Sequence, residues 1–447
     1  MKREAITRSH RRGTLLTLVI AFAIEGAALA QHRANPLRYT VAPSVPTEIT
    51  MTTLPNASCA LHRENDADPA NQLKLYADPQ GVIRFHTLPS AESEIPAAVV
   101  IDCNANGQVE SYPLQLRSHS KPTSDMPSPP AGLRKALPGG AHVRPALVGD
   151  EALRLSEEEL VSRGYPLRPD PDQAPDAFDA WRRAVSVPAT FVEPALVARP
   201  EVTHAGRIRQ GAITNGAETT GNWSGFELQK IYGSYNWVNG MWYVPYVTAT
   251  PNTHAYSAFW IGLDGDGPTD LVQAGTEQEI LDISTWGAHF TFSTYYAWTE
   301  FLPTQKVEQQ VSGLAVHPGD TISVQVWVGD MNASPNLNGA YCIFHIQNLS
   351  NAQYTTVYTP RGSTAIDGSE AEWVMERPTV NGSLPYLANY GTVNMYSASA
   401  RKADGTGFVA YQGDTNAQIT MMNGSHILST VTPLNTYTMT FRWIAGN

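Results

Sequence analysis

The chain has 447 residues and a formal net charge of −11, and 42% of its residues are hydrophobic. This length and apolar content exclude a disordered chain and allow two or three domains with sizeable cores. The charge is uneven, because residues 212–447 hold 7 Lys and Arg against 18 Asp and Glu, whereas residues 1–211 hold 23 of each. An acidic C-terminal part lacks the basic surface that binds phosphates, so we expect no nucleic-acid partner.

The N-terminus has the layout of a secretory signal peptide over residues 1–30. Five basic residues precede the apolar run 15–24, and Ala28-Leu29-Ala30 follows it. A transmembrane anchor is the alternative, but the run is short and Glu25 interrupts it. We therefore expect a secreted protein, extracellular or, in a cell with an outer membrane, periplasmic, with no membrane anchor once the signal is removed.

Residues 31–117 are predicted to form a small β-rich module. Short alternating runs at 72–76, 82–86 and 97–102 are separated by Asp-Pro and Asn-Gly turn signals. In an exported chain a disulfide between Cys59 and Cys103 is expected, whereas Cys342 lies in an apolar run and is expected to be a buried, inert thiol.

A Pro/Gly/Ser-rich linker is predicted over residues 118–145, followed by a partly helical segment over 146–211. Ser156 with Glu159 predicts the start of a short helix, and a second helix is expected over 176–185. Basic residues gather between 194 and 216, where we expect processing: Arg199, His204, Arg207 and Arg209. The alternative is that residues 31–211 are a permanent accessory domain.

Residues 212–447 are predicted to be all-β. Aromatic and β-branched runs recur between Gly, Asn, Asp and Pro turns, and helical periodicity is nearly absent; examples are 237–244, 290–301, 321–328, 341–348, 353–358 and 437–443. Many short strands at this spacing favour an antiparallel sandwich of two sheets.

One of these runs places carboxylates inside an apolar strand. In Ser-Glu-Ala-Glu-Trp-Val-Met-Glu-Arg-Pro, residues 369–378, strand alternation puts Glu372, Val374 and Glu376 on one face. An exposed edge strand with solvated acids is the simpler interpretation of this stretch alone. A groove lined by the same face would instead use Glu376 for proton transfer.

An ordered set of motifs accompanies this strand. Asn-Trp-Ser-Gly at 222–225, Gly-Met-Trp-Tyr-Val-Pro at 240–245, Ala-Phe-Trp-Ile-Gly-Leu-Asp-Gly at 258–265, Leu-Val-Gln-Ala-Gly at 271–275 and Tyr-Tyr-Ala-Trp-Thr-Glu-Phe-Leu-Pro at 295–303 precede Ala-Glu-Trp-Val-Met-Glu at 371–376. In this order they resemble the glutamic peptidases, the eqolisin family, over about residues 220–395. The resemblance implies a two-sheet, concanavalin-like jelly roll, a pre-proprotein and an acid endopeptidase.

The resemblance also implies the catalytic residues, which are Gln273 and Glu376. Glu376 would take a proton from water and pass it to the leaving amine, while the Gln273 amide would stabilise the oxyanion. Trp260, Asp264 and Glu300 match positions that support the family's cleft. Three further tryptophans are candidates for a substrate platform: Trp223, Trp242 and Trp298. Solvent exposure is the simpler expectation for Glu372.

The sequence lacks the signatures of the aspartic, zinc and serine hydrolases. Paired Asp-Thr/Ser-Gly loops, His-Glu-x-x-His and Gly-x-Ser-x-Gly are absent from it. A glycoside-cleaving or carbohydrate-binding sandwich that pairs Glu376 with Glu300 or Asp264 remains open, as does a lectin-like module. We expect protein or peptide substrates, a monomer, and no metal or organic cofactor, because no residue cluster has metal-ligand spacing.

Overall fold

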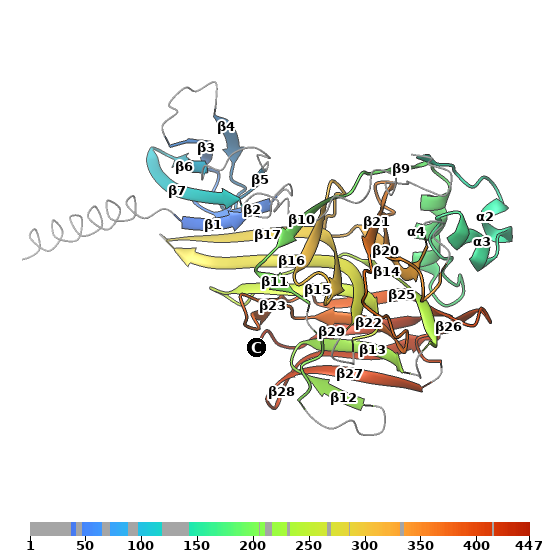
Figure 1. The fold of residues 1–447 in the computed structure, drawn as a ribbon. Helices are drawn as coiled ribbons and strands as arrows, with labels where there is room; N and C mark the ends of the chain where they lie inside the picture. Colours follow the sequence, from blue (N-terminus) through green and yellow to red (C-terminus); the bar gives the residue numbers. More distant parts are fainter. Residues whose placement is uncertain are drawn as a thin grey trace, which may run out of the picture.

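The computed structural model describes residues 37–41, 47–64, 72–87, 97–118, 143–204, 206–210, 217–229, 233–265, 270–285, 287–330, 335–413 and 415–447. The expected signal peptide and almost all of the expected linker lie outside these residues. The described part is mostly β-structure, as the sequence predicts (Figure 1). Among the described helices, none has the length and apolar character needed to cross a membrane.

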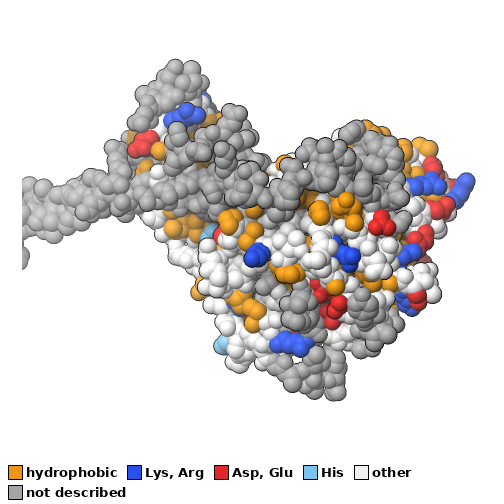
Figure 2. Space-filling model, viewed as in Figure 1, with side chains coloured by type: hydrophobic (Ala, Val, Ile, Leu, Met, Phe, Trp, Pro, Cys, Tyr) orange, Lys and Arg blue, Asp and Glu red, His pale blue; other side chains and the backbone are white. Residues whose placement is uncertain are grey.

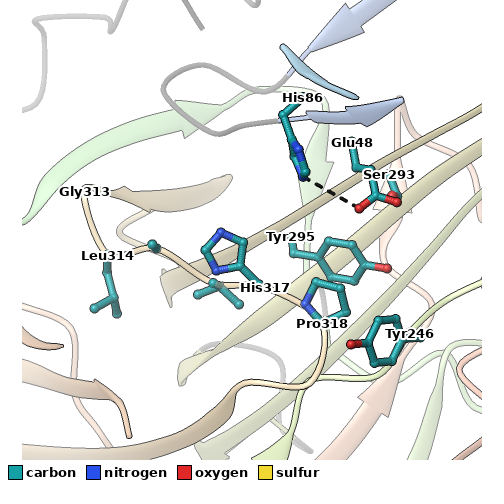
Figure 3. Close-up of a pocket in the computed structure, with 11 residues that line it drawn as sticks. Glu48, His86, Tyr246, Ser293, Tyr295, Gly313, Leu314, His317 and Pro318 are labelled. Atoms are coloured by element: carbon teal, nitrogen blue, oxygen red, sulfur yellow. Dashed lines mark ion pairs between the residues drawn. The ribbon is translucent and has the colours of Figure 1, made fainter. Parts of the chain in front are cut away.

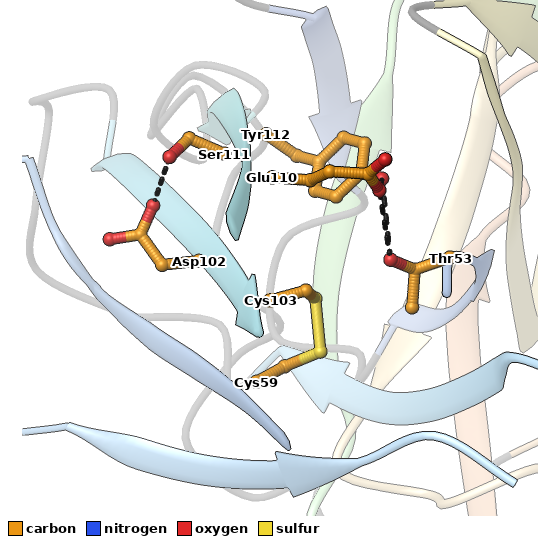
Figure 4. Close-up of a disulfide and its surroundings, with 7 residues drawn as sticks. All are labelled: Thr53, Cys59, Asp102, Cys103, Glu110, Ser111 and Tyr112. Atoms are coloured by element: carbon orange, nitrogen blue, oxygen red, sulfur yellow. Dashed lines mark hydrogen bonds between the residues drawn. A yellow bond between two sulfur atoms is a disulfide. The ribbon is translucent and has the colours of Figure 1, made fainter. Parts of the chain in front are cut away.

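The N-terminal module is a five-stranded sheet in the order β1-β7-β6-β3-β4 (Figure 1, upper left). Its strands are β1 (Leu37–Val41), β3 (Ser58–Arg63), β4 (Leu73–Tyr76), β6 (Ala97–Ala105) and β7 (Gln108–Ser118). The predicted disulfide is confirmed: Cys59 and Cys103 face each other across β3 and β6 and are bonded (Figure 4). Beside it, the Ser111 hydroxyl donates a hydrogen bond of 2.5 Å to Asp102.

Two antiparallel strands join this module to the rest of the molecule. They are β2 (Thr47–Thr52) and β5 (Val82–Thr87), and β2 also pairs with residues 289–293 of the long strand β17 (Ala288–Leu302). Phe290 and Phe292 of β17 are fully buried in the same apolar cluster as Ile49 and Met51 of β2. The module therefore shares both backbone hydrogen bonds and a core with the large β-domain.

Three helices follow, at the right of Figure 1: α2 (Glu151–Arg154), α3 (Glu157–Ser162) and α4 (Pro175–Val185). Ser156 caps α3 in a reciprocal capping box with Glu159, as its sequence predicts. The apolar face of α4 buries Trp181, which packs in one cluster with Met241 of the β-domain. Charged side chains gather over this helical region in Figure 2, where the helices meet solvent.

Short strands flank the helices, with β8 before them and the others after them. These are β8 (Val143–Arg144), β9 (Ala189–Phe191), β10 (Ala195–Arg199), β11 (Val202–Thr203) and β12 (Ala217–Thr220). β9 pairs with β21, β10 with β18, and β11 with β23, so this part of the chain adds strands to the β-domain. Three strands between residues 189 and 203 are thus hydrogen-bonded to the domain that follows.

The large domain contains the strands that the sequence predicts. They are β13 (Trp223–Gln229), β14 (Tyr235–Tyr243), β15 (His254–Leu263), β16 (Leu271–Thr285), β17, β18 (Glu308–Ser312), β19 (Thr321–Gly329), β20 (Tyr341–Asn348), β21 (Gln353–Pro360), β22 (Glu370–Glu376), β23 (Thr379–Val380), β24 (Tyr386–Leu387), β25 (Thr392–Lys402), β26 (Phe408–Ala410), β27 (Thr415–Asn423), β28 (His426–Asn435) and β29 (Thr438–Trp443). Cys342 is buried with a free thiol, as expected.

Two runs of neighbouring strands organise this domain. One run follows the order β18-β17-β16-β15-β22-β13-β27, and the other β21-β20-β19-β14-β25-β29. The main apolar core takes side chains from both runs, including Phe259 and Trp373 from the first and Val324 and Phe344 from the second. Because strand alternation sends every second side chain into this core, the opposite face of the first run is available for a site.

Candidate active site

β22 is a central strand, and this decides the environment of Glu376. β22 pairs with β13 on one side and with β15 on the other, so the interpretation as an exposed edge strand is wrong. Trp373 and Met375 point into the main core, while Val374 lies on the opposite face among tryptophans. Glu376 shares the face of Val374 and is fully buried, as strand alternation predicts.

Gln273 of β16 and Glu300 of β17 lie on adjacent strands of the same run, and β15 separates them from β22. They are direct cross-strand partners in the β16–β17 ladder, and both side chains are fully buried. The Gln273 amide donates to Glu300 Oε2 across 3.1 Å. This bond identifies which end of the amide is the nitrogen, and it leaves Oε1 of Gln273 without a hydrogen-bond partner among the described residues.

Gln273, Glu300 and Glu376 meet at one residue from the N-terminal half, His204. Gln273 Nε2 donates to the His204 carbonyl oxygen across 2.7 Å, and the His204 backbone N–H donates to Glu300 Oε2 across 2.9 Å. The imidazole Nδ1 lies 3.0 Å from Glu376 Oε2. The fold thus brings Gln273 and Glu376, which are 103 positions apart in the sequence, to the same buried residue.

Tryptophans form the walls of this site. Trp260 donates its indole N–H to Glu376 Oε2 across 2.8 Å, which leaves Oε1 of Glu376 unpartnered among the described residues. Trp298 stacks on the His204 ring with 3.7 Å between centroids and an angle of 5° between planes. Trp223 packs edge-on against Trp260. Three of the tryptophans singled out from sequence therefore belong to one face, and Trp260 holds Glu376 directly.

Further carboxylates surround the imidazole. His204 Nε2 lies 2.9 Å from Glu308 Oε2 and 3.9 Å from Glu277 Oε2, and all these side chains are buried. Burial by itself lowers the pKa of His204, but Glu376 and Glu308 raise it well above its usual range. The ring is therefore an imidazolium, since both nitrogens face carboxylates. Burial raises the pKa of Glu300 to about 7, although His204 opposes this, and burial also raises the pKa of Glu277.

Among the described residues, two clusters have donor atoms close enough for a metal ion. His204, Glu277 and Glu308 form one, and Glu227, Glu370 and Glu372 form the other, each with its atoms within 4.8 Å of one another. Both clusters already contain or adjoin a cation, because His204 is charged in the first and Arg207 is hydrogen-bonded to Glu227 in the second. We propose no metal at the first cluster.

Three expectations from the sequence need revision. Trp242 lies in the main core against Phe259 and donates to Thr276, so we no longer assign it to a substrate platform. Asp264 is buried, but its carboxylate accepts hydrogen bonds from the backbone N–H groups of residues 368–370, which lead into β22, and not from Gln273. The expected exposure of Glu372 is wrong, because the central position of β22 buries it completely.

His204 is the residue that the sequence analysis missed as part of the site. It lies 172 positions before Glu376, and periodicity cannot report a contact over that distance. One signal was available: it stands in the only basic cluster that directly precedes an acidic domain with few cations of its own. Opposite charges separated along a chain can be paired by the fold.

A separate pocket of about 280 Å³ lies where the strand pair β2 and β5 meets the β-domain (Figure 3). Its lining includes Glu48 of β2, His86 of β5, and Tyr246, Tyr295 and His317 of the β-domain. His86 Nε2 lies 3.7 Å from Glu48 Oε2, and both side chains are partly exposed. None of the residues of the buried carboxylate site lines this pocket, so we assign it no part in the chemistry.

The chain is similar to known proteins over about half of its length. The peptidase A4 family matches residues 221–443. Aspergillopepsin-2 of Aspergillus niger is 27% identical over 214 residues, which cover 43% of this chain and 68% of that protein. Scytalido-glutamic peptidase with a transition state analog inhibitor is 20% identical with a TM-score of 0.40, covering 50% of this chain and 98% of that structure. SCP-B, an eqolisin with a bound tripeptide Ala-Ile-His, is 19% identical with a TM-score of 0.38 and the same coverage.

Proposed function

Because this chain belongs to the peptidase A4 family, the eqolisins, and is a glutamic endopeptidase by that membership, we propose that Gln273 and Glu376 are its catalytic dyad. The observation that supports the proposal is that both residues contact one residue, His204. Gln273 Nε2 donates to the carbonyl oxygen of His204, and Glu376 contacts the side chain of the same residue. A substrate carbonyl bound in that position would have both groups within reach.

The atoms left unpartnered suit the water that hydrolysis requires. Glu376 Oε1 and Gln273 Oε1 are both buried acceptors, and buried acceptors in folded proteins nearly always have a donor. A water that donates to both would be deprotonated by Glu376 as its oxygen bonds to the carbonyl carbon. The Gln273 N–H then stabilises the oxyanion. Glu376 returns the proton to the amide nitrogen, the C–N bond breaks, and a carboxylic acid and an amine leave.

Supporting roles follow from the hydrogen bonds. Trp260 fixes one oxygen of Glu376 and thereby directs the other towards the water. Glu300 fixes the nitrogen end of the Gln273 amide. Trp298 and Trp223 form an apolar wall of the site. We propose that they are the platform on which a peptide substrate lies.

We assign residues 1–30 to a signal peptide, residues 31–211 to a removable pro-region and residues 212–447 to the peptidase. We also propose a secreted, monomeric enzyme with a two-sheet jelly roll as its catalytic domain, and the carboxyl-rich site supports activity in acid. The presence of His204 in the site supports a zymogen rather than a permanent accessory domain. The sugar-directed alternative is not favoured, because the family match is to peptidases.

The test is proteolysis of a denatured protein by the purified full chain between pH 2 and pH 7. Glu376→Gln and Gln273→Ala are expected to lose the activity, and His289→Ala, a change at a partly exposed histidine of β17, is expected to retain it. Cleavage that persists in Glu376→Gln would overturn the assignment of the dyad. An inert wild-type chain across the whole range, including after prolonged acid treatment, would overturn the peptidase function.

A further inference from the structure

A second group of buried carboxylates lies on the same face of β22 as Glu376 but outside the proposed dyad. Glu372 of β22 and Glu227 of β13 are direct partners in the β13–β22 ladder, and both side chains are fully buried. Glu370 lies two residues before Glu372 on the same face and is partly exposed. One carboxylate oxygen from each of these three glutamates lies within 4.8 Å of the others. Strand pairing therefore gathers three carboxylates at one point.

This cluster is separated from the dyad along β22. Glu372 precedes Glu376 by four residues, which corresponds to roughly 13 Å along an extended strand. Val374 lies between them on this face and packs in one apolar cluster with Trp223 and Trp260. The three carboxylates therefore take no part in the chemistry proposed for the dyad.

The carboxylate of Glu372 has two acceptor oxygens without a donor. Both oxygens are buried, and neither accepts a hydrogen bond from a described residue. Buried acceptors nearly always have a partner, and burial of a charged group without one is especially costly. A Cβ atom at position 265 would lie 3.2 Å from one of these oxygens and 3.3 Å from the other. Because that residue is Gly265, no side chain covers the oxygens from this side.

The arginines around the cluster leave an excess of negative charge. Arg207 lies 3.0 Å from Glu218 and is hydrogen-bonded to Glu227, and Arg209 lies 3.0 Å from the other oxygen of Glu218. Two arginines thus face Glu218 and the three glutamates of the cluster. When all four carboxyl groups are ionised, one divalent cation would bring this balance to zero.

Two aspartates near the cluster are held by backbone groups instead. Asp264 accepts from the N–H groups of residues 368–370, and Asp270 accepts from the N–H of Asp367 across 2.9 Å. Hydrogen bonds of this kind stabilise a carboxylate in its charged form. The uncompensated charge therefore lies on the three glutamates of the cluster.

The donor atoms indicate which cation fits. A set of carboxylate oxygens favours a hard cation such as Ca²⁺ or Mg²⁺ over Zn²⁺ or Cu²⁺. Two oxygens that bind one Ca²⁺ at about 2.3–2.6 Å lie up to about 5 Å apart, whereas Mg²⁺ holds them within about 4.2 Å. Separations of up to 4.8 Å in the cluster therefore fit Ca²⁺.

We propose that Glu227, Glu370 and Glu372 bind one divalent cation of the calcium type, which balances their charge beside Arg207 and ties β13 to β22. The ligands come from strands more than 140 positions apart, so no local spacing in the sequence reports them. The proposal concerns binding and stability of the full chain, and it does not depend on the peptidase function.

The first experiment measures thermal unfolding of the full chain at about pH 7.5, after treatment with EDTA and dialysis. We expect about 5 mM CaCl₂ to raise the unfolding midpoint of the wild type by about 3 °C or more relative to NaCl of equal ionic strength, because a ligand that binds only the folded state stabilises it. Glu372→Gln is expected to lose this increase, whereas Asp179→Asn, a change at an exposed acid of α4, keeps it. No increase in the wild type, or an equal increase in Glu372→Gln, would overturn the proposal.

A second experiment measures binding without unfolding the chain. Tb³⁺ replaces Ca²⁺ at oxygen sites and emits light when a nearby tryptophan is excited, and the Trp223 ring lies 5.8 Å from the Arg207 guanidinium carbon beside the cluster. We expect emission from the wild type that Ca²⁺ displaces, with Tb³⁺ affinity weakened about 10-fold or more in Glu370→Gln, which loses one charged ligand. Affinity in Glu370→Gln equal to that of the wild type contradicts the proposal. Neither experiment follows peptide hydrolysis, so a negative result leaves the dyad assignment unaffected.

Discussion

Gln273 and Glu300 face each other across β16 and β17, and the Gln273 amide nitrogen lies 3.1 Å from Glu300 Oε2. Either end of an amide can point at a substrate. The Glu300 carboxylate holds the nitrogen end, so the Gln273 N–H is directed towards the carbonyl group in the site, which is that of His204 in this structure. Glu300 is therefore a positioning residue for the proposed dyad.

We expect Glu300→Leu to lower kcat by about 10-fold or more, because the Gln273 amide loses the partner that orients it. Glu300→Gln retains a carbonyl acceptor of the same shape and is expected to recover most of this loss. The measurement is kcat and KM for one peptide over the acid range. Equal losses in the two variants would show that the charge of Glu300, rather than its acceptor, matters.

Gln273→Ala should remove the oxyanion donor and reduce kcat by about 10²- to 10³-fold, with a much smaller effect on KM. Gln418→Ala is the matched control, because Gln418 also donates to a backbone carbonyl, that of Val431, on another strand of the domain. Its activity is expected to match the wild type. A large rise in KM with unchanged kcat in Gln273→Ala would assign Gln273 to substrate binding instead.

The folded chain is expected to lose stability as pH rises from about 4.5 to about 8. Burial raises the pKa of Glu300 to about 7 and that of Glu370 to about 8, and also raises the pKa of Glu372. The folded state thus holds protons that the unfolded state has already released, so the free energy of unfolding falls through this window. Thermal unfolding followed at each pH tests this, and a midpoint that rises towards neutral pH would contradict it.

Glu372 provides a specific variant for that trend. Its carboxylate is fully buried, and neither oxygen has a hydrogen-bond partner among the described residues. Glu372→Gln keeps the shape without a titratable group, and we expect a flatter dependence of the unfolding midpoint on pH, with the gain largest near neutral pH.

Reduction of the disulfide is expected to destabilise the N-terminal module. Cys59 and Cys103 are 44 positions apart, and closing a loop of that size is worth about 4 kcal/mol in the chain-entropy account. We expect a reducing agent to make residues 47–118 sensitive to proteases while the large β-domain stays resistant. A Cys59→Ser, Cys103→Ser double variant should respond to the protease in the same way with or without the reductant.

Alternation along a strand predicted much of this arrangement. It placed Glu376 and Glu372 on the same face as Val374, and the motif at 271–275 singled out Gln273, which lies on β16 with β15 between it and β22. Periodicity could not report whether a strand is central or at an edge, which is why the exposure of Glu372 was misjudged. The choice between the two faces of β14 was equally undetermined, and Trp242 proved to point into the core.

The part of the site contributed by His204 depends on pairings that no local pattern contains. β10 joins β18 and β11 joins β23, across separations of more than a hundred residues. Basic residues at 199–209 suggested processing, but only the fold shows that three of them are buried against carboxylates. Charge asymmetry between the halves of a chain is the sequence feature that could have prompted this expectation.

The backbone pairing between the two halves has a consequence for how any cleaved form behaves. β2 is bonded to β17, β9 to β21 and β10 to β18, and all three lie before His204. A cut near residue 204 breaks one peptide bond but none of these ladders. The cleaved halves would therefore remain together as a noncovalent complex, which runs as one species in native gel filtration and as two in denaturing electrophoresis. Release of the first half would require the outer edges of β17 and β18 to come apart from it, exposing strand edges that can pair with other chains.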